Sequence, residues 1–248
     1  MKKYLFVIAR YQDERQDLFE ESISPKNKDY CFRHGMEYLL IDNSWNLPDF
    51  RENPTWLKFY LLEQFYHNAE IEMGDRIIHF DADMVIVKPD MEYLTEKSFS
   101  YAIDSCNSHC MGNFCINLNE WSIGLIKNIL DEDLYQKNKN IKFWQHFREQ
   151  AAWYSLAGIQ PFNGQSFLTL PHYGFHSAQA EDAKYIVTEL LDHVEVKDPI
   201  WNVTLLQEEI DNRQAWALRR LFINKTLPND TILRHFANKQ PWREEYLQ

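Results

Sequence analysis

The sequence has little glycine, no closely paired cysteines and no long apolar run. Only 7 residues are glycine, while 45% are hydrophobic and 15% aromatic, which argues against a collagen-like or disordered chain. The apolar run from Leu5 to Ala9 is too short for a signal-peptide core, and nothing approaches the roughly 18 apolar residues of a membrane span. We therefore expect a cytoplasmic globular protein. No segment is typical of a linker, so we expect one domain over residues 1–248.

Positive charge is also scarce. The chain has 26 lysines and arginines against 37 aspartates and glutamates, which gives a formal net charge of −11. Such a surface repels nucleic acid, so we expect no nucleic-acid partner. A ligand that carries phosphate would need a metal ion or a local group of basic side chains.

The four cysteines, Cys31, Cys106, Cys110 and Cys115, include no C-x-x-C pair. This spacing disfavours a zinc site, and we interpret the cysteines as buried thiols.

Short apolar runs alternate with segments of helical periodicity. Segments typical of strands are 4–9, 38–41, 76–80, 114–118 and 232–236. A segment typical of a helix begins at 17–21, and we expect Ser24-Pro25 to interrupt it. Further segments typical of helices are 55–69, 121–130, 142–156, 182–191 and 214–222. Residues 161–176 are typical of loops and short strands. The alternation predicts an α/β protein with a mainly parallel sheet and helices on both faces.

Two carboxylates, in the motif Asp81-Ala82-Asp83, follow the predicted strand 76–80. In open α/β sheets, ligands bind outside the carboxyl ends of the strands. Oxygen ligands suit Mg²⁺ and Mn²⁺, which in turn bridge diphosphate oxygens. A D-x-D motif alone is weak evidence in an acidic chain, but the buried strand before it strengthens the prediction of a metal site.

Several further motifs follow in order between about residues 55 and 240: Trp56-Leu57-Lys58, IIHFDADMVIVKPD, MGNFCINLNEW, REQAAWYSLAG, Trp201-Asn202 and ILRHFAN. Together they resemble the GT-A glycosyltransferases, especially families eight and thirty-four. The resemblance implies a three-layer, Rossmann-like GT-A fold. It also implies a Mn²⁺- or Mg²⁺-dependent enzyme that moves a hexose or pentose, with retention, from a nucleotide-diphosphate sugar. A UDP-sugar is the favoured donor, and a glycan, a glycolipid or another hydroxyl compound is the acceptor.

The resemblance also implies roles for single residues around the metal. Asp83 would bind the metal directly, Asp81 would bind the metal or the ribose more loosely, and His235 would be the third protein ligand. Lys58 would lie near the nucleotide or its phosphates.

Other positions would surround the donor. Ala9, Arg10 and Tyr11 would border the base and ribose, while Glu149 and Gln150 would lie beside the anomeric carbon. The chain departs from the family pattern here, because Glu149 stands where the family has Asp. Cys110 stands where family eight has Asn, and the family's His-x-x-Gly ending is replaced by residues 235–238, HFAN.

Two other functions fit the same motif. Asp81-Ala82-Asp83-Met84-Val85 also matches a haloacid-dehalogenase-type phosphatase, in which Asp81 would be the nucleophile. That motif normally opens the chain and needs a later G-D pair, and neither holds here. The second alternative is a nucleotide- or sugar-binding protein without turnover.

Several assignments stay open. An inverting mechanism would need a carboxylate base, for which Glu149, Asp104 and Asp182 are candidates. His172 and His176 could contact the acceptor or belong to a structural loop, and Trp201 could stack on a sugar or fill an apolar gap. Peripheral contact with a membrane is open too, although no basic helix favours it.

Overall fold

The computed structural model describes residues 1–13, 15–51, 53–103, 109–158, 184–197, 201 and 233–235. In this part of the chain, six strands form one sheet in the order β2-β1-β3-β6-β5-β7, and β4 and β8 form a second, two-stranded sheet. The strands are β1 (Lys3–Ile8), β2 (Glu37–Ile41), β3 (Arg76–Phe80), β4 (Met84–Ile86), β5 (Phe99–Ile103), β6 (His109–Asn117), β7 (Val194–Lys197) and β8 (Leu233–His235).

The large sheet is mainly parallel, as predicted. Strand β1 is parallel to both β2 and β3, and β5 is parallel to β7. Strand β6 is antiparallel to both of its neighbours, β3 and β5. The carboxyl ends of β1, β2 and β3 therefore meet at one edge of the sheet, which is where this architecture binds ligands.

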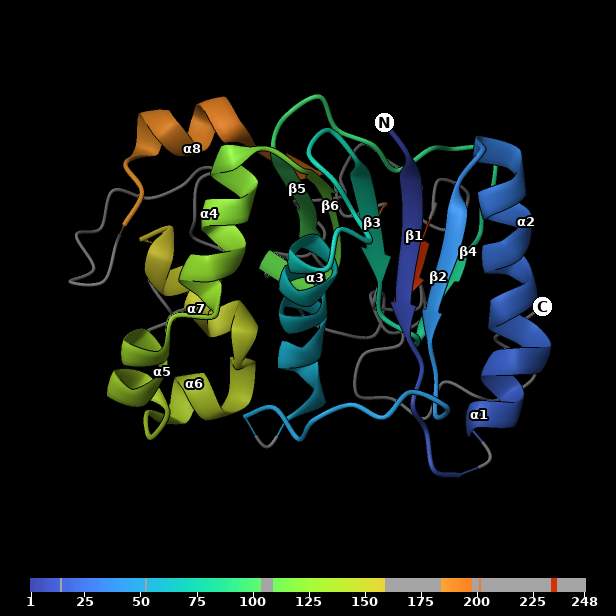
Figure 1. The fold of residues 1–248 in the computed structure, drawn as a ribbon, viewed down its shortest axis with the longest axis horizontal. Coiled ribbons are helices and arrows are strands. Elements are labelled where there is room, and N and C mark those ends of the chain that lie inside the picture. The colour runs from blue at the N-terminus through green and yellow to red at the C-terminus, as the bar shows by residue number, and fades with distance from the viewer. Residues whose placement is uncertain are drawn as a thin grey trace, which may run out of the picture.

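Helices cover both faces of the sheet, as predicted. The helical segments are α1 (Arg15–Leu18), a π-helical turn (Phe19–Ile23), α2 (Ser24–His34), a 3₁₀ turn (Pro54–Trp56), α3 (Leu57–His67), α4 (Glu120–Ile129), α5 (Glu132–Asn138), α6 (Lys142–Phe147), α7 (Glu149–Leu156) and α8 (Val187–His193). In Figure 1, α3, α4 and α7 gather towards one side of the strands, and α1 and α2 lie at the other.

The period-2 alternation of β1 explains this arrangement. Tyr4 and Phe6 belong to a core that includes residues of α3, α4 and α7, whereas Leu5 and Val7 belong to a second core that includes residues of α2. Successive side chains of a strand point to opposite faces, so each face of the strand packs against its own helices.

The predicted interruption at Ser24-Pro25 is wrong. The backbone stays helical from Arg15 to His34, because the π-helical turn leads directly into α2. Pro25 lies in the first turn of α2, directly after the π-helical turn, in which the Ser24 N–H donates to the Phe19 carbonyl five residues earlier.

The prediction of one helix over 142–156 is also wrong. Arg148 has φ 56° and ψ −120°, which ends α6 and starts α7 in a new direction. The predicted end at Gly158 is confirmed, since this glycine has a positive φ of 64° just past α7. The break makes Glu149 the first residue of α7.

Other boundaries differ less. Strand β6 is longer than predicted, α8 begins later than predicted, and β5 and β7 were not predicted. The segments predicted at 161–176 and 214–222 lie outside the described residues. Among the helices that the structure describes, none has both the length and the apolar character needed to cross a bilayer.

Candidate active site

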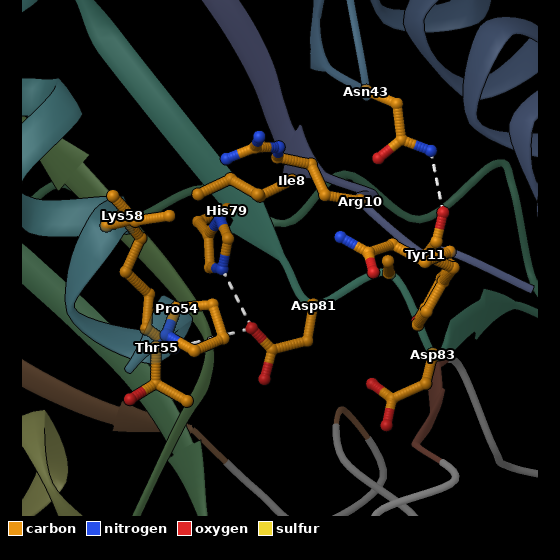
Figure 2. A pocket seen from close by; sticks show the side chains of 13 residues that line it. Ile8, Arg10, Tyr11, Asn43, Pro54, Thr55, Lys58, His79, Asp81 and Asp83 are labelled. Atoms are coloured by element: carbon orange, nitrogen blue, oxygen red, sulfur yellow. Dashed lines mark hydrogen bonds and ion pairs between the residues drawn. The ribbon is translucent and has the colours of Figure 1, made fainter. Parts of the chain in front are cut away.

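A pocket of about 400 Å³ lies at the carboxyl ends of β1, β2 and β3, beside the start of α3. Five of the predicted site residues line it: Arg10, Tyr11, Lys58, Asp81 and Asp83 (Figure 2). Ala9 is fully buried next to them, and its N–H donates to the Ile41 carbonyl at 2.8 Å. A ligand would therefore meet the side chains of Arg10 and Tyr11 rather than that of Ala9.

The acidic pair sits in a tight turn directly after β3. The Asp81 N–H donates to the Gly112 carbonyl at 2.7 Å, and the Asp81 carbonyl accepts from the Met84 N–H at 3.0 Å. The first hydrogen bond joins the turn to β6, and the second closes the turn. Both carboxylates reach into the same pocket (Figure 2).

Lys58 lies below Asp81 and is almost completely buried. Its Nζ is 3.3 Å from Asp81 Oδ1, 3.0 Å from Glu149 Oε1 and 2.8 Å from the Met111 carbonyl. Burial alone would lower the pKa of Lys58, but the charges of Asp81 and Glu149 outweigh it and hold the pKa above its usual value. An ammonium group has three N–H donors, and the three acceptors match them.

His79 was not predicted as a site residue, yet it lines the pocket. Its Nε2 is 3.0 Å from Asp81 Oδ1, and its Nδ1 is 3.0 Å from the Phe6 carbonyl. Burial lowers the pKa of His79, and the hydrogen bond to Asp81 opposes that shift only in part. The sequence held one signal for this contact. Residues i and i+2 of a strand share a face, which puts a polar side chain at 79 beside the carboxylate at 81.

Glu149 and Gln150 come to the site from α7. Glu149 is buried, and its Oε2 accepts no hydrogen bond from the residues that the structure describes. Gln150 Oε1 accepts from the Met111 N–H at 3.2 Å, and its Nε2 donates to the Tyr154 hydroxyl at 3.2 Å. Glu149 thus joins the pocket through Lys58, and Gln150 is fixed against β6 nearby.

Tyr11 and Asn43 form the opposite wall of the pocket. Asn43 Nδ2 donates to the Tyr11 carbonyl at 2.6 Å, which joins the loops after β1 and β2. Burial, followed by the charges of Asp83 and Asp81, raises the pKa of Tyr11 well above its usual range. The phenol therefore stays neutral beside the two carboxylates.

Solved structures share the fold of this chain, although sequence comparison finds no match. No protein-family model matches the sequence, and no curated protein does. A glycosyltransferase involved in the glycosylation of the major capsid of PBCV-1 superposes with a TM-score of 0.53 at 10% identity, over 95% of this chain and 93% of that one. The glycosyltransferase GlyE of Streptococcus pneumoniae TIGR4 superposes with a TM-score of 0.54 at 14% identity. That match covers 98% of this chain and 57% of GlyE.

The chain has the GT-A glycosyltransferase fold. The predicted fold class is thereby confirmed. The pocket lies where strand β3 ends and the loop with the D-x-D motif begins, which is where the resemblance led us to expect that motif.

The third predicted metal ligand, His235, is the last residue of strand β8. Strand β8 pairs antiparallel with β4, and His235 lies opposite Met84, the residue after Asp83. The described side chains include no group of three or more His, Cys, Asp or Glu residues that could hold a metal. The carboxylates of Asp81 and Asp83 line one pocket, and carboxylate oxygens are ligands that Mn²⁺ and Mg²⁺ prefer.

The remaining predicted residues have mixed outcomes. The Trp201 ring packs against Tyr93 at 4.9 Å between ring centroids, and its carbonyl accepts from Asn113 Nδ2 at 2.6 Å, which fits the gap-filling interpretation. Three cysteines are buried free thiols as predicted: Cys31, Cys110 and Cys115. Cys106, Asp104, His172, His176, Asp182 and Asn202 lie outside the described residues.

Proposed function

We propose that this chain is a metal-dependent glycosyltransferase that transfers a hexose or pentose from a nucleotide-diphosphate sugar to a hydroxyl acceptor. A UDP-sugar is the favoured donor, and a glycan or glycolipid is the favoured acceptor. The observation that carries the proposal is the placement of Asp81 and Asp83 in one pocket at the carboxyl ends of β1 and β3, within a GT-A fold.

The chemistry needs positive charge where the diphosphate departs. A bound Mn²⁺ or Mg²⁺ would act there as a Lewis acid and a template. Asp83 and His235 would hold the ion directly, and Asp81 would hold it more loosely. Arg10 is exposed at the pocket, where its guanidinium can pair with phosphate oxygens. Lys58 could reach a phosphate only by leaving one of its three protein acceptors.

At the sugar end, Glu149 and Gln150 would stabilise positive charge that develops at the anomeric carbon. Glu149 has a buried oxygen without a partner among the described residues, so it retains the capacity to accept a hydrogen bond. We propose a retaining reaction, in which no separate carboxylate base is needed to activate the acceptor.

A thermal-shift experiment tests the proposal. Wild-type protein is melted with UDP, GDP or CMP, each with and without Mn²⁺. One nucleoside diphosphate should stabilise the protein only with the metal. At 100 times its Kd, a ligand adds about 2.7 kcal/mol, or roughly 5–10 °C in Tm at this chain length.

The matched variants are Asp83→Asn, which should lose the shift, and Asp90→Asn, an exposed surface change that should keep it. If an aspartyl-phosphate mimic stabilises the protein and no nucleotide does, the phosphatase hypothesis replaces the transferase hypothesis. If a nucleotide binds but no sugar is transferred, a binding protein without turnover is the better reading. The anomeric configuration of the product distinguishes retention from inversion.

A further inference from the structure

The position of the Asp81 carboxylate depends on His79, a residue that the proposed chemistry does not use. The His79 ring is almost fully buried, at 1% exposure. It stacks on Phe114 with 4.8 Å between ring centroids and lies against Phe6 at 5.4 Å. Packing on these two rings leaves the imidazole with little freedom to rotate. A neutral imidazole has one N–H, so it donates either to the Phe6 carbonyl or to Asp81, and the inference concerns the tautomer with the proton on Nε2.

With the ring held in this way, its second nitrogen points at one atom. Nε2 lies 3.0 Å from Asp81 Oδ1, and Lys58 Nζ lies 3.3 Å from the same oxygen. Oδ1 is therefore held from two sides by groups that are themselves fixed in the core. Figure 2 shows both contacts, and it shows the second carboxylate oxygen of Asp81 turned away from His79.

We propose that His79 is a positioning residue: it fixes the rotation of the Asp81 carboxylate, so that Oδ1 stays bonded to the protein and Oδ2 is presented to a divalent cation. The inference rests on the proposed function, since it concerns the metal of that site.

Two substitutions separate the two contacts of the ring. In His79→Asn, the amide reaches about as far as Nδ1 and can keep the Phe6 contact, but it is too short for Asp81. In His79→Gln, the amide reaches about as far as Nε2 and can donate to Asp81. If His79 has a purely structural role, the Asn variant should bind Mn²⁺ at least as tightly as the Gln variant. If His79 positions Asp81, the Gln variant should bind Mn²⁺ more tightly.

The readout is Mn²⁺ affinity, measured from the electron paramagnetic resonance signal of free Mn²⁺, with MnCl₂ alone and with MnCl₂ plus UDP. Loss of an outer hydrogen-bond partner typically weakens metal binding 10- to 100-fold. We expect at least tenfold weaker binding for His79→Asn, and recovery of most of the affinity for His79→Gln. His193→Asn is the matched control. The His193 ring stacks on Trp121 and is hydrogen-bonded to Ser98, and neither of these two residues lines the pocket.

Equal affinities for His79→Asn and wild type would overturn the inference, and so would Gln binding as weakly as Asn. If His79→Asn fails to fold, the comparison of His79→Gln with wild type still tests the inference, because a loss of Mn²⁺ affinity in His79→Gln would overturn it. Asp83→Asn separates this failure from failure of the proposed function. If Asp83→Asn abolishes Mn²⁺ binding and both His79 variants bind normally, only the role of His79 falls. If the wild type binds no Mn²⁺, the metal-dependent function falls, and the role of His79 falls with it.

Discussion

At the scale of single residues, Lys58 is a buried charge whose position depends on its partners. Its ammonium lies between Asp81 and Glu149 and is nearly inaccessible to water. A buried charge is costly unless it is paired, and removal of one partner leaves the others uncompensated. The two carboxylates come from different elements, the end of β3 and the start of α7, so Lys58 links the pocket to α7.

Lys58→Met should therefore destabilise the fold by about 3 kcal/mol, which is the order found when one partner of a buried ion pair is removed. Urea unfolding measures the change. The double variant Lys58→Met with Glu149→Gln should recover at least about 1 kcal/mol, because it removes one of the two stranded charges. Lys127→Met, at an exposed site on α4, is the control and should stay within about 0.5 kcal/mol of wild type. A Lys58→Met protein as stable as that control would show that the pairs contribute nothing.

At the scale of elements, the break between α6 and α7 decides where Glu149 points. Arg148 adopts a positive φ of 56°, which non-glycine residues rarely adopt. Arg51 has a similar φ of 53°, but its guanidinium donates to the Leu130 carbonyl at 2.7 Å and lies 4.3 Å from the Tyr135 ring centroid. The two arginines thus share a positive φ, and the Arg51 side chain in addition makes these two contacts.

Arg148→Gly should raise the free energy of unfolding by about 1 kcal/mol, since glycine adopts positive φ without steric cost. Arg51→Gly should lower it by about 2 kcal/mol or more, because relief of the same strain does not offset the lost hydrogen bond and cation–π contacts. Paired urea unfolding curves give both values. A loss of stability in Arg148→Gly would mean that the arginine side chain holds the break in place.

The elements that form the pocket could largely be predicted from the sequence. β1 and β3 are short, mainly apolar runs and α3 has helical spacing, and the D-x-D motif follows β3 at once. The break at Arg148 could not be predicted, because nothing in 142–156 disrupts helical spacing and the residue is neither Gly nor Pro. Strand β5 (Phe99–Ile103) was missed, although Phe99, Tyr101 and Ile103 alternate with Ser100 and Ala102.

Contacts in the site were harder to predict than its members. Only the family resemblance gave Lys58 a role, near the nucleotide or its phosphates. Its observed partner Glu149 comes from a helix more than 90 residues later. Such relations depend on how α3, β6 and α7 pack in space, which no local pattern contains. The resemblance supplied the residues, and the packing supplied their partners.

At the scale of the whole molecule, the pocket depends on two sheets. The large sheet supplies Asp81 at the end of β3, whereas β4 begins just after Asp83 and pairs only with β8 in the described structure. The net charge of −11 makes the pocket's few cations more important, because the surface as a whole repels a diphosphate.

His235→Ala tests whether the small sheet delivers a metal ligand. The fold should be kept, because β8 pairs with β4 through its backbone. Mn²⁺ affinity should fall by more than about tenfold, since loss of even an outer partner costs that much. His67→Ala, at an exposed position on α3, is the control, and far-UV circular dichroism verifies folding. Unchanged Mn²⁺ affinity would remove His235 from the ligand set and leave the acidic pair.

The pairing of residue 84 with residue 235 also has a consequence for the order in which the protein forms. Closing so long a loop costs chain entropy that the local β1–β2 and β5–β6 pairings do not incur. The large sheet can therefore assemble first, with the acidic turn in place but the small sheet still open. If the proposed metal site uses His235, a nascent or refolding chain would complete that site only when β8 pairs with β4.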